Sequence, residues 1–163
     1  MPPGRPKWVN TVRIVIQRVK NASVRVDGLV TGEIGTGLLI FLGVTHSDTE
    51  EEADYLTDKT IQLRIFPDES GRMNRSLLET GGELLVVSQF TLYGDTRKGR
   101  RPGFDEAAQP EKARALYQYF VNRLKTSNLI VQTGVFQADM QVHLINDGPV
   151  TFILDSSQRS RVK

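Results

Sequence analysis

Two nearly continuous apolar segments, residues 35–44 and 83–93, constrain the fold of this chain more than any other feature. Runs of this kind are typical of strands that are buried on both faces of a sheet. Each run is followed by an apolar stripe at helical spacing, the first within residues 48–63 and the second within residues 110–124. The sequence therefore predicts two consecutive strand–helix units, which indicate an α/β fold.

Further strands are predicted on both sides of these units. Alternating apolar residues over 12–19 and 23–26 lead into Asp27-Gly28, a dipeptide that is typical of a hairpin turn. Residues 67–82 are polar and contain glycine, which predicts a loop. Three closing strands are predicted at residues 130–136, 140–145 and 150–154. The order of two strands, two strand–helix units and three strands predicts a single mixed α/β domain.

The net charge of +2 comes from the two ends of the chain. Residues 12–155 hold 16 basic and 19 acidic side chains, whereas all the charged side chains of the two ends are basic. The charge of the domain therefore gives no support for general nucleic-acid binding. Three prolines and no periodicity predict a disordered extension over residues 1–11, and the polar residues 156–163 predict a flexible tail.

Several classes of protein are disfavoured by what the sequence lacks. The chain has no cysteine, so it has no disulfide framework and no thiol nucleophile. Residues 37–44, the longest apolar run, are too short to span a membrane, and residues 1–11 lack the apolar core of a signal peptide. We therefore expect a cytoplasmic protein without a membrane partner. His46 and His143 lack the spacing of metal ligands, and we predict no metal and no cofactor.

Three segments carry polar groups suited to chemistry or binding. Ser-Gln-Phe-Thr-Leu at 88–92 places hydroxyls and an amide at the end of an apolar strand, where α/β proteins tend to bind ligands. Asn-Asp-Gly-Pro-Val-Thr at 146–151 combines a glycine that permits close approach with a proline that fixes φ. Four cations within residues 95–101 indicate a phosphate-contacting loop. Taken singly, the three segments also fit a polar strand face, a turn and a solvated loop.

Taken together, SQFTL at 88–92 and NDGPVT at 146–151 resemble the two signature motifs of the D-aminoacyl-tRNA deacylases of the D-Tyr-tRNA deacylase type. The resemblance covers roughly residues 12–155. The other matching stretches are RIVIQRV at 13–19, GLLIFLGV at 37–44, MNRSL at 73–77, RP-x-F-x-x-AA-x-P at 101–110 and ADMQV at 138–142. Gly103 and Gln137 depart from the family pattern. Val12 stands where the family usually begins with Met, which supports an added extension or a mis-assigned start before it.

This resemblance implies a single mixed β/α domain with three layers, β/β/α, and a hydrolase without a cofactor. The implied reaction is hydrolysis of the ester between a D-amino acid and the 3′ end of tRNA, with glycine mischarged on tRNA as a further substrate. The implied assembly is a homodimer with its active sites at the subunit interface. Gly148 and Pro149, as a Gly-cisPro unit, would reach into the partner's pocket and exclude L-amino acids.

The resemblance also implies roles for single residues. The catalytic pocket would be lined by Ser88, Gln89, Phe90 and Thr91, with the Phe90 and Thr91 amides facing an oxyanion. Arg18 would brace the Gly148–Pro149 unit. Met140, Ala107 and Ala108 would complete the substrate pocket, the two alanines near the terminal adenosine. We expect the tRNA to be contacted by Arg97, Lys98, Arg100 and Arg101.

Two questions remain open at the level of sequence. The attack is driven either by the Thr91 hydroxyl or with help from the 2′-OH of the terminal ribose, and the lack of an adjacent base beside Thr91 favours the 2′-OH. The rival functions are a non-catalytic nucleic-acid-binding protein and a deacylase that removes L-alanine from a mismatched tRNA. Short tails disfavour the first, and the intact SQFTL and NDGPVT motifs disfavour the second.

Overall fold

The computed structural model describes residues 12–158, so the predicted extension at 1–11 and residues 159–163 of the predicted tail lie outside the described part. The strands are β1 (Arg13–Val26), β2 (Leu29–Ile34), β3 (Gly37–Gly43), β4 (Phe66–Pro67), β5 (Met73–Arg75), β6 (Glu83–Ser88), β7 (Val131–Thr133) and β8 (Gln141–Asp155). The helices are α1 (Glu50–Gln62), α2 (Leu77–Thr80) and α3 (Pro110–Lys125), and two 3-10 turns are η1 (Phe90–Tyr93) and η2 (Ser156–Gln158).

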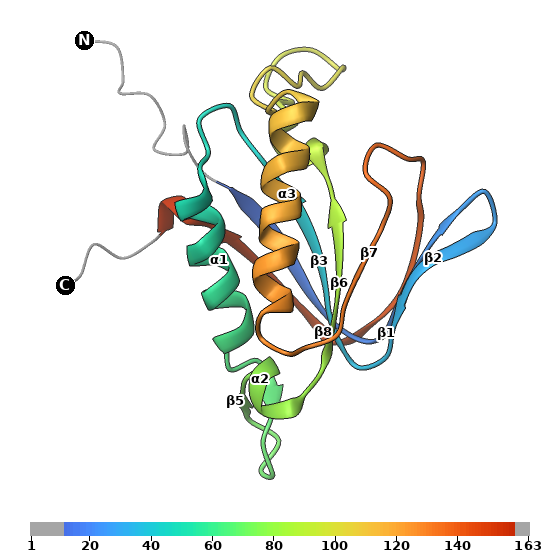
Figure 1. Ribbon diagram of the computed structural model, residues 1–163, viewed down its shortest axis with the longest axis vertical. Coiled ribbons are helices and arrows are strands. Elements are labelled where there is room, and N and C mark those ends of the chain that lie inside the picture. The colour runs from blue at the N-terminus through green and yellow to red at the C-terminus, as the bar shows by residue number, and fades with distance from the viewer. Residues whose placement is uncertain (1–11, 159–163) are drawn as a thin grey trace.

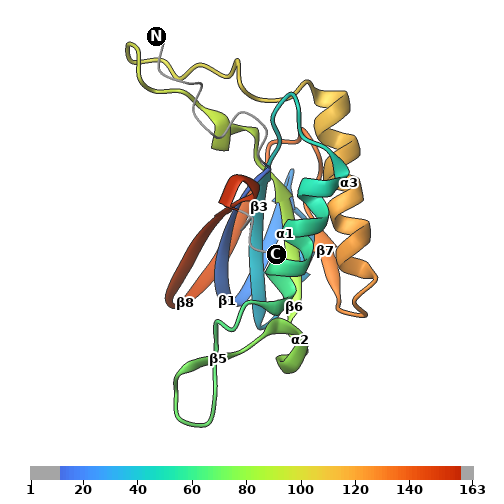
Figure 2. The same cartoon turned by 90° about the vertical axis from the view of Figure 1, so that its left-hand side faces the viewer.

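Six strands form one mixed sheet around β1, which pairs antiparallel with β2, β3 and β8. β3 and β6 are parallel, as are β6 and β7. Parallel neighbours need a crossover connection, which α1 and α3 contribute as the predicted strand–helix units require. Both helices cover the same face of the sheet (Figures 1 and 2). The predicted hairpin turn at Asp27-Gly28 joins β1 to β2.

Buried apolar side chains form one cluster on each face of the central strands. Leu38, Ile40 and Leu42 of β3 pack in the larger cluster with α1 and α3. Leu39 points to the opposite face and packs with Leu85 of β6 in the second cluster, which the second half of β1, β2 and β8 complete. Burial on both faces explains the continuous apolar run. The prediction of a single mixed α/β domain is confirmed. No helix within residues 12–158 is long and apolar enough to cross a membrane.

Two predicted boundaries in the middle of the chain are wrong. The strand expected over residues 83–93 ends at Ser88, where the chain leaves the sheet and turns into η1. Residues 67–82, expected to be a loop, contain β5 and α2. The Ser76 hydroxyl accepts a hydrogen bond from the Glu79 N–H, and the Glu79 carboxylate accepts one from the Ser76 N–H. This reciprocal capping stabilises a helix that is too short to show an apolar stripe.

The two closing strands predicted at 140–145 and 150–154 are parts of the single strand β8. The register between β1 and β8 shifts across the Asp-Gly-Pro segment, but the pairing resumes beyond it. Asn146 bridges the interruption, because its Oδ1 accepts from the Val150 N–H (2.8 Å) and its Nδ2 donates to Thr151 Oγ1 (3.0 Å). The turn residues therefore make a bulge in a strand and not the end of one.

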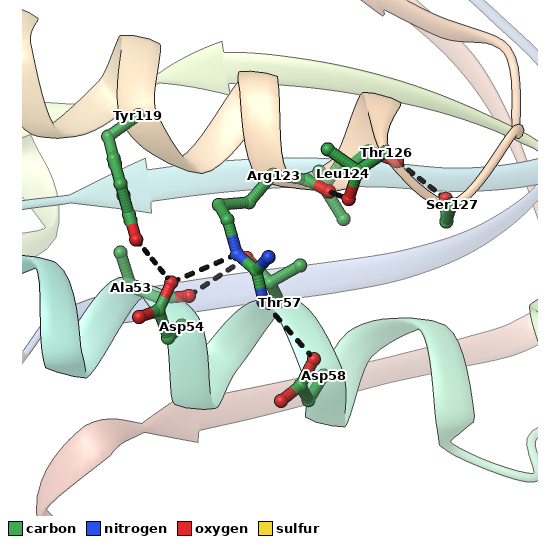
Figure 3. A network of polar contacts seen from close by, with 9 residues as sticks. All are labelled: Ala53, Asp54, Thr57, Asp58, Tyr119, Arg123, Leu124, Thr126 and Ser127. Atoms are coloured by element: carbon green, nitrogen blue, oxygen red, sulfur yellow. Dashed lines mark hydrogen bonds and ion pairs between the residues drawn. The ribbon is translucent and has the colours of Figure 1, made fainter.

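A polar network joins α1 to α3 (Figure 3). Asp54 of α1 accepts a hydrogen bond from the Tyr119 hydroxyl (2.7 Å) and pairs with Arg123 Nε at 3.0 Å. The second arm of the Arg123 guanidinium lies 3.9 Å from Asp58. The network lies on the helical layer and links two helices that are far apart in the sequence.

Candidate active site

The Ser88–Leu92 motif forms a tight turn at one end of the central sheet. Ser88 is the last residue of β6 and lies opposite Leu42 of β3. The Gln89 backbone N–H donates to the Leu42 carbonyl (2.8 Å), and the chain then leaves the sheet as η1. Thr91 is exposed, and the Gln89 side-chain amide donates to its Oγ1. The polar groups of the motif are therefore displayed at the strand end, as the sequence predicted.

The loop after η1 brings an aromatic ring and the predicted alanines to the same end. Phe104 packs edge-on against Phe90, with 5.0 Å between the ring centroids and 65° between the planes. Phe90 is 56% exposed and Phe104 is 37% exposed, so the pair presents an apolar surface to solvent. Ala107 pairs with Thr45 in an isolated bridge, which holds Ala108 beside the end of β3. Sequence reasoning did not select Phe104, although it stands in the matched 101–110 stretch.

The basic loop lies in this segment, and one of its four cations is already paired. Arg97 donates two side-chain hydrogen bonds, of 2.9 and 2.8 Å, to the Asp95 carboxylate. These bonds lower the pKa of Asp95 to about 2 and raise the pKa of Arg97. Lys98, Arg100 and Arg101 are exposed and form no ion pair within the described part of the chain. The available positive charge of the loop therefore comes from these three side chains.

Gly148 and Pro149 lie exposed in β8 and are joined by a cis peptide bond, the isomer that the resemblance implies. Arg18 of β1 holds the residue before them, because its Nε donates to the Asp147 carbonyl (3.0 Å). Its Nη1 donates to the Ile65 carbonyl (2.7 Å), so one guanidinium ties two separate backbone segments together. The Arg18 side chain is only 11% exposed. Arg18 therefore fixes the backbone next to the Gly148–Pro149 unit, while the unit itself stays exposed to solvent.

Within one chain, the Gly148–Pro149 unit and the η1 turn lie apart. Arg18, which holds the unit, is paired with Leu38 of β3, and Leu38 is paired with Leu84 of β6. These three residues therefore mark the same height across the sheet. Ser88 lies four residues further along β6, a distance of about 13 Å at the usual strand rise. Three strand spacings, about 14 Å of sheet, also separate β8 from β6. The structure brings the loop residues to η1, but it does not bring Gly148 and Pro149 there.

Other residues selected from the sequence have separate surroundings. Met140 is half buried in the second core cluster, where its Sδ closes over Gly134. The Nε2 atom of His46 contacts the Asp105 carbonyl. His143 stands opposite Ser23 in the pairing of β8 with β1. Residues 12–158 contain no group of three or more His, Cys, Asp or Glu side chains that could hold a metal ion.

Most of the chain matches the model of a known protein family. Residues 15–155 match the family model described as D-Tyr-tRNA(Tyr) deacylase. The chain belongs to the D-Tyr-tRNA(Tyr) deacylase family. Its relatives include a D-aminoacyl-tRNA deacylase of Thermosipho africanus, 59% identical over 90% of this chain and 99% of the relative. Another, from Bacillus velezensis, is 56% identical over 90% of this chain and all of the relative.

Solved structures share the deacylase fold. One described as the c-Myc DNA Unwinding Element Binding Protein superposes with a TM-score of 0.82 at 40% identity, covering 87% of this chain and 97% of that chain. A probable eukaryotic D-amino acid tRNA deacylase superposes with a TM-score of 0.79 at 18% identity, over 89% of this chain and 99% of that chain. The family membership confirms the predicted enzyme class, a hydrolase that acts on the ester of aminoacyl-tRNA.

A buried carboxylate supports the backbone beside the candidate site. Asp48, which follows β3, is 3% exposed, and its Oδ2 accepts a hydrogen bond from the Thr45 N–H (2.6 Å). Thr45 in turn pairs with Ala107, so the carboxylate fixes the backbone against which the loop rests. Burial raises the pKa of Asp48 to about 6, and the bonds from Thr45 and the charge of Lys112 oppose this shift. The nearby charge of Glu52 adds to it.

We expect the contribution of Asp48 to the free energy of unfolding to fall as the pH rises from about 4 to about 6. In this range the native Asp48 retains a proton that the unfolded chain has released, because its pKa rises from 3.8 to about 6 on folding. Asp48→Asn keeps an acceptor for the Thr45 N–H but does not titrate. Relative to the parent, the variant should gain at most about 3 kcal/mol across the window. Urea unfolding of both proteins at several pH values measures this, and parallel curves would contradict it.

Proposed function

We propose that the end of the sheet at η1 binds the aminoacylated 3′ end of tRNA and hydrolyses the ester of a D-amino acid or of glycine. The convergence of different groups at this end carries the proposal. The Ser88–Thr91 segment offers polar groups, the Phe90–Phe104 pair offers a surface on which a base can stack, and the adjacent loop offers cations for phosphates. Because the proposed substrate is aminoacyl-tRNA, we propose that the protein acts in the cytoplasm.

The pocket is completed, in this proposal, by the Gly148–Pro149 unit of a second copy of the chain. The unit is exposed and braced, yet it stands too far from η1 to serve the pocket of its own chain. A homodimer would allow each unit to enter the partner's pocket. The active unit is then the dimer, and a single chain holds only half of each site.

A rigid main-chain gate suits the discrimination that this reaction requires. D- and L-amino acids carry the same functional groups, so only the position of the side chain can distinguish them. The carbonyls of Gly148 and Pro149 would face the α-amino group and leave no space on the side where an L side chain projects. Glycine has no side chain to exclude, which is why it is included as a substrate. Arg18 contributes by fixing the Asp147 carbonyl beside the gate.

Hydrolysis adds water to the ester carbonyl carbon and places negative charge on the carbonyl oxygen. The first amides of a helical turn have no partner within it, so the Phe90 and Thr91 N–H groups are suited to bind this oxyanion. Collapse of the intermediate breaks the bond to the ribose 3′-oxygen, which leaves with a proton as the free tRNA. The neighbouring 2′-OH would assist the attack, since the Thr91 hydroxyl accepts from the Gln89 amide and is hydrogen-bonded to no base among residues 12–158.

Thr91→Ala should therefore retain activity within about tenfold of the parent, because the oxyanion is bound by backbone amides that the substitution leaves in place. Single-turnover deacylation of D-Tyr-tRNA measures the rate. A substrate that ends in 2′-deoxyadenosine should react slowly with both proteins. Complete loss of turnover in the variant with intact tRNA binding, or normal turnover of the deoxy substrate, would instead favour Thr91 as the nucleophile.

The function itself is tested by offering the purified protein four substrates, D-Tyr-tRNA, Gly-tRNA, L-Tyr-tRNA and L-Ala-tRNA. We expect hydrolysis of the first two and protection of the last two. Preferential hydrolysis of L-Ala-tRNA would indicate the rival deacylase. Binding of nucleic acid without any hydrolysis would favour a non-catalytic role, which the name of the structural relative at 40% identity makes worth testing.

A further inference from the structure

Arg13 at the start of β1 makes three contacts with two different parts of the chain. Its Nε pairs with the Asp155 carboxylate of β8 at 3.1 Å, and its Nη1 donates to the Leu92 carbonyl in η1, also at 3.1 Å. The guanidinium lies over the Tyr93 ring, 5.0 Å from its centroid. One side chain therefore connects the end of β8 to the turn that carries the polar motif. Neither partner is near Arg13 in the sequence.

The turn η1 packs directly on the end of β3. The turn lies over Gly43 of β3, where an added Cβ would stand 3.0 Å from Leu92 Cβ and from the Tyr93 ring. Arg13 and Gly43 are paired across β1 and β3, so they face the same side of the sheet. Behind the turn lies a hollow of about 300 Å³, lined by Arg13, Leu92, Tyr93 and Glu106 among others. Among the described residues, the Arg13 side chain therefore lies between the hollow and the buried Tyr93 ring, against the turn that it bonds.

Asp155 gives Arg13 a fixed anchor. The residue is 8% exposed, and both of its carboxylate oxygens are used. One accepts from Arg13 Nε and the other accepts from the Ser157 N–H at 3.0 Å. A buried carboxylate with its oxygens satisfied holds its partner in one geometry, because any other arrangement leaves a buried charge without a partner. The remaining arm of the guanidinium is thereby directed at Leu92.

We propose that Arg13, anchored by Asp155, is a positioning residue for hydrolysis. It fixes the Leu92 carbonyl and so the orientation of η1, whose first amides, those of Phe90 and Thr91, bind the developing oxyanion. The inference rests on the proposed function of that turn. An oxyanion site contributes only when its donors are held in place before the reaction, so loosening the turn lowers the rate of the chemical step more than the affinity for tRNA.

The test compares Arg13→Ala, Asp155→Ala and the double variant in single-turnover and steady-state deacylation of D-Tyr-tRNA. We expect Arg13→Ala to lower kcat about tenfold or more while KM stays within about twofold. The double variant should lose no more than the stronger single variant, because the two side chains act as one unit. Arg13→Lys, a point cation that cannot hold both partners at once, should restore only part of the rate.

Arg123 offers the matched control. It is also an arginine that pairs with carboxylates of another element, Asp54 and Asp58 of α1 (Figure 3). Its side chain is 39% exposed, against 28% for Arg13. Arg123→Ala should lower the melting temperature but leave kcat unchanged. An equal loss of kcat in this control, a kcat within twofold of the parent in Arg13→Ala, or losses that multiply in the double variant would overturn the inference.

A second readout does not depend on activity. In Arg13→Ala the amides of Leu92 and Gly94, which close the turn by bonds to Gln89 and Thr91, should exchange with solvent at least about tenfold faster. Unchanged exchange in a folded variant would overturn the inference whatever the enzyme does. If the parent protein deacylates no substrate, the proposed function of the turn fails, and this measurement alone then decides whether Arg13 fixes η1.

Discussion

Gly148→Ala should lower kcat/KM for D-aminoacyl-tRNA by about a hundredfold, because it moves a gate that must sit within about an ångström of the substrate. Gly148 has a φ of +133°, a conformation that is almost confined to glycine. An added Cβ would stand 2.8 Å from Val150 Cγ2 and 3.2 Å from Arg18 Nη2, so it would press on the side chain that braces the Asp147 carbonyl. The expected loss of stability is about 1–3 kcal/mol.

Gly28→Ala is the matched control for this substitution. Gly28 also has a positive φ, +80°, and an added Cβ would meet nothing within 4 Å. Both substitutions place a side chain on a residue with positive φ, but Gly28 lies in the β1–β2 turn and touches no part of the gate. The control should unfold at a lower urea concentration and hydrolyse D-Tyr-tRNA at the parent rate. If both variants lose activity in proportion to their stability, the gate has no special role at Gly148.

Mixing experiments distinguish a gate that acts on the partner from one that acts within its own chain. Phe90→Pro removes an amide that we propose faces the oxyanion, and proline is tolerated at the first position of a helical turn. In a mixed dimer with Gly148→Ala, one pocket combines an intact turn with an intact gate from the other chain. Random reassociation of two inactive variants should then restore about one quarter of the parent activity. No recovery, with mixed dimers present, would contradict a gate shared between subunits.

The fold was predictable from the sequence where a residue pattern is compatible with a single secondary structure and a single degree of burial. The run 37–44 had to be a buried strand, since Leu39 packs on one face and Leu38 and Ile40 on the other. The continuity of β8 through residues 147–149 was not predictable in the same way. Asp147-Gly148-Pro149 carries ordinary turn chemistry, and only the Asn146 side chain and Arg18, a residue from a distant strand, allow the strand to continue past it.

In the candidate site, too, the local motif was predictable from the sequence and the contacts between distant residues were not. A local motif indicated Ser88–Thr91, but its neighbours depend on contacts across the fold that spacing does not reveal. Phe104 meets Phe90 only because the loop folds back, and Arg13 reaches Leu92 over a separation of 79 residues. The pairing of Arg97 with Asp95, two positions away, is a local effect that charge counting overlooked. It changes which cations of the loop are available.

The combined substitution of Lys98, Arg100 and Arg101 by alanine should weaken tRNA binding most strongly at low salt. Each cation that contacts a phosphate releases a counterion, so removing three should make the slope of log K against log salt shallower by about 2 to 3. The affinity near 50 mM salt should fall by about tenfold or more. Arg97→Ala should have a smaller effect, since its guanidinium is already bound to Asp95. Titrations of tRNA at several salt concentrations measure both quantities.

The control for this effect must remove the same charge from another place. Lys59, Arg72 and Lys125 are exposed. Lys59 is in the last turn of α1, Arg72 lies between β4 and β5, and Lys125 is the last residue of α3, whereas the basic loop precedes the first residue of α3. Their combined substitution should leave the salt slope nearly unchanged. Removal of residues 1–11 should also matter little, although it subtracts Arg5 and Lys7. If either change weakened binding more than the loop substitutions, tRNA would be held by the general charge of the protein and not by a local patch beside η1.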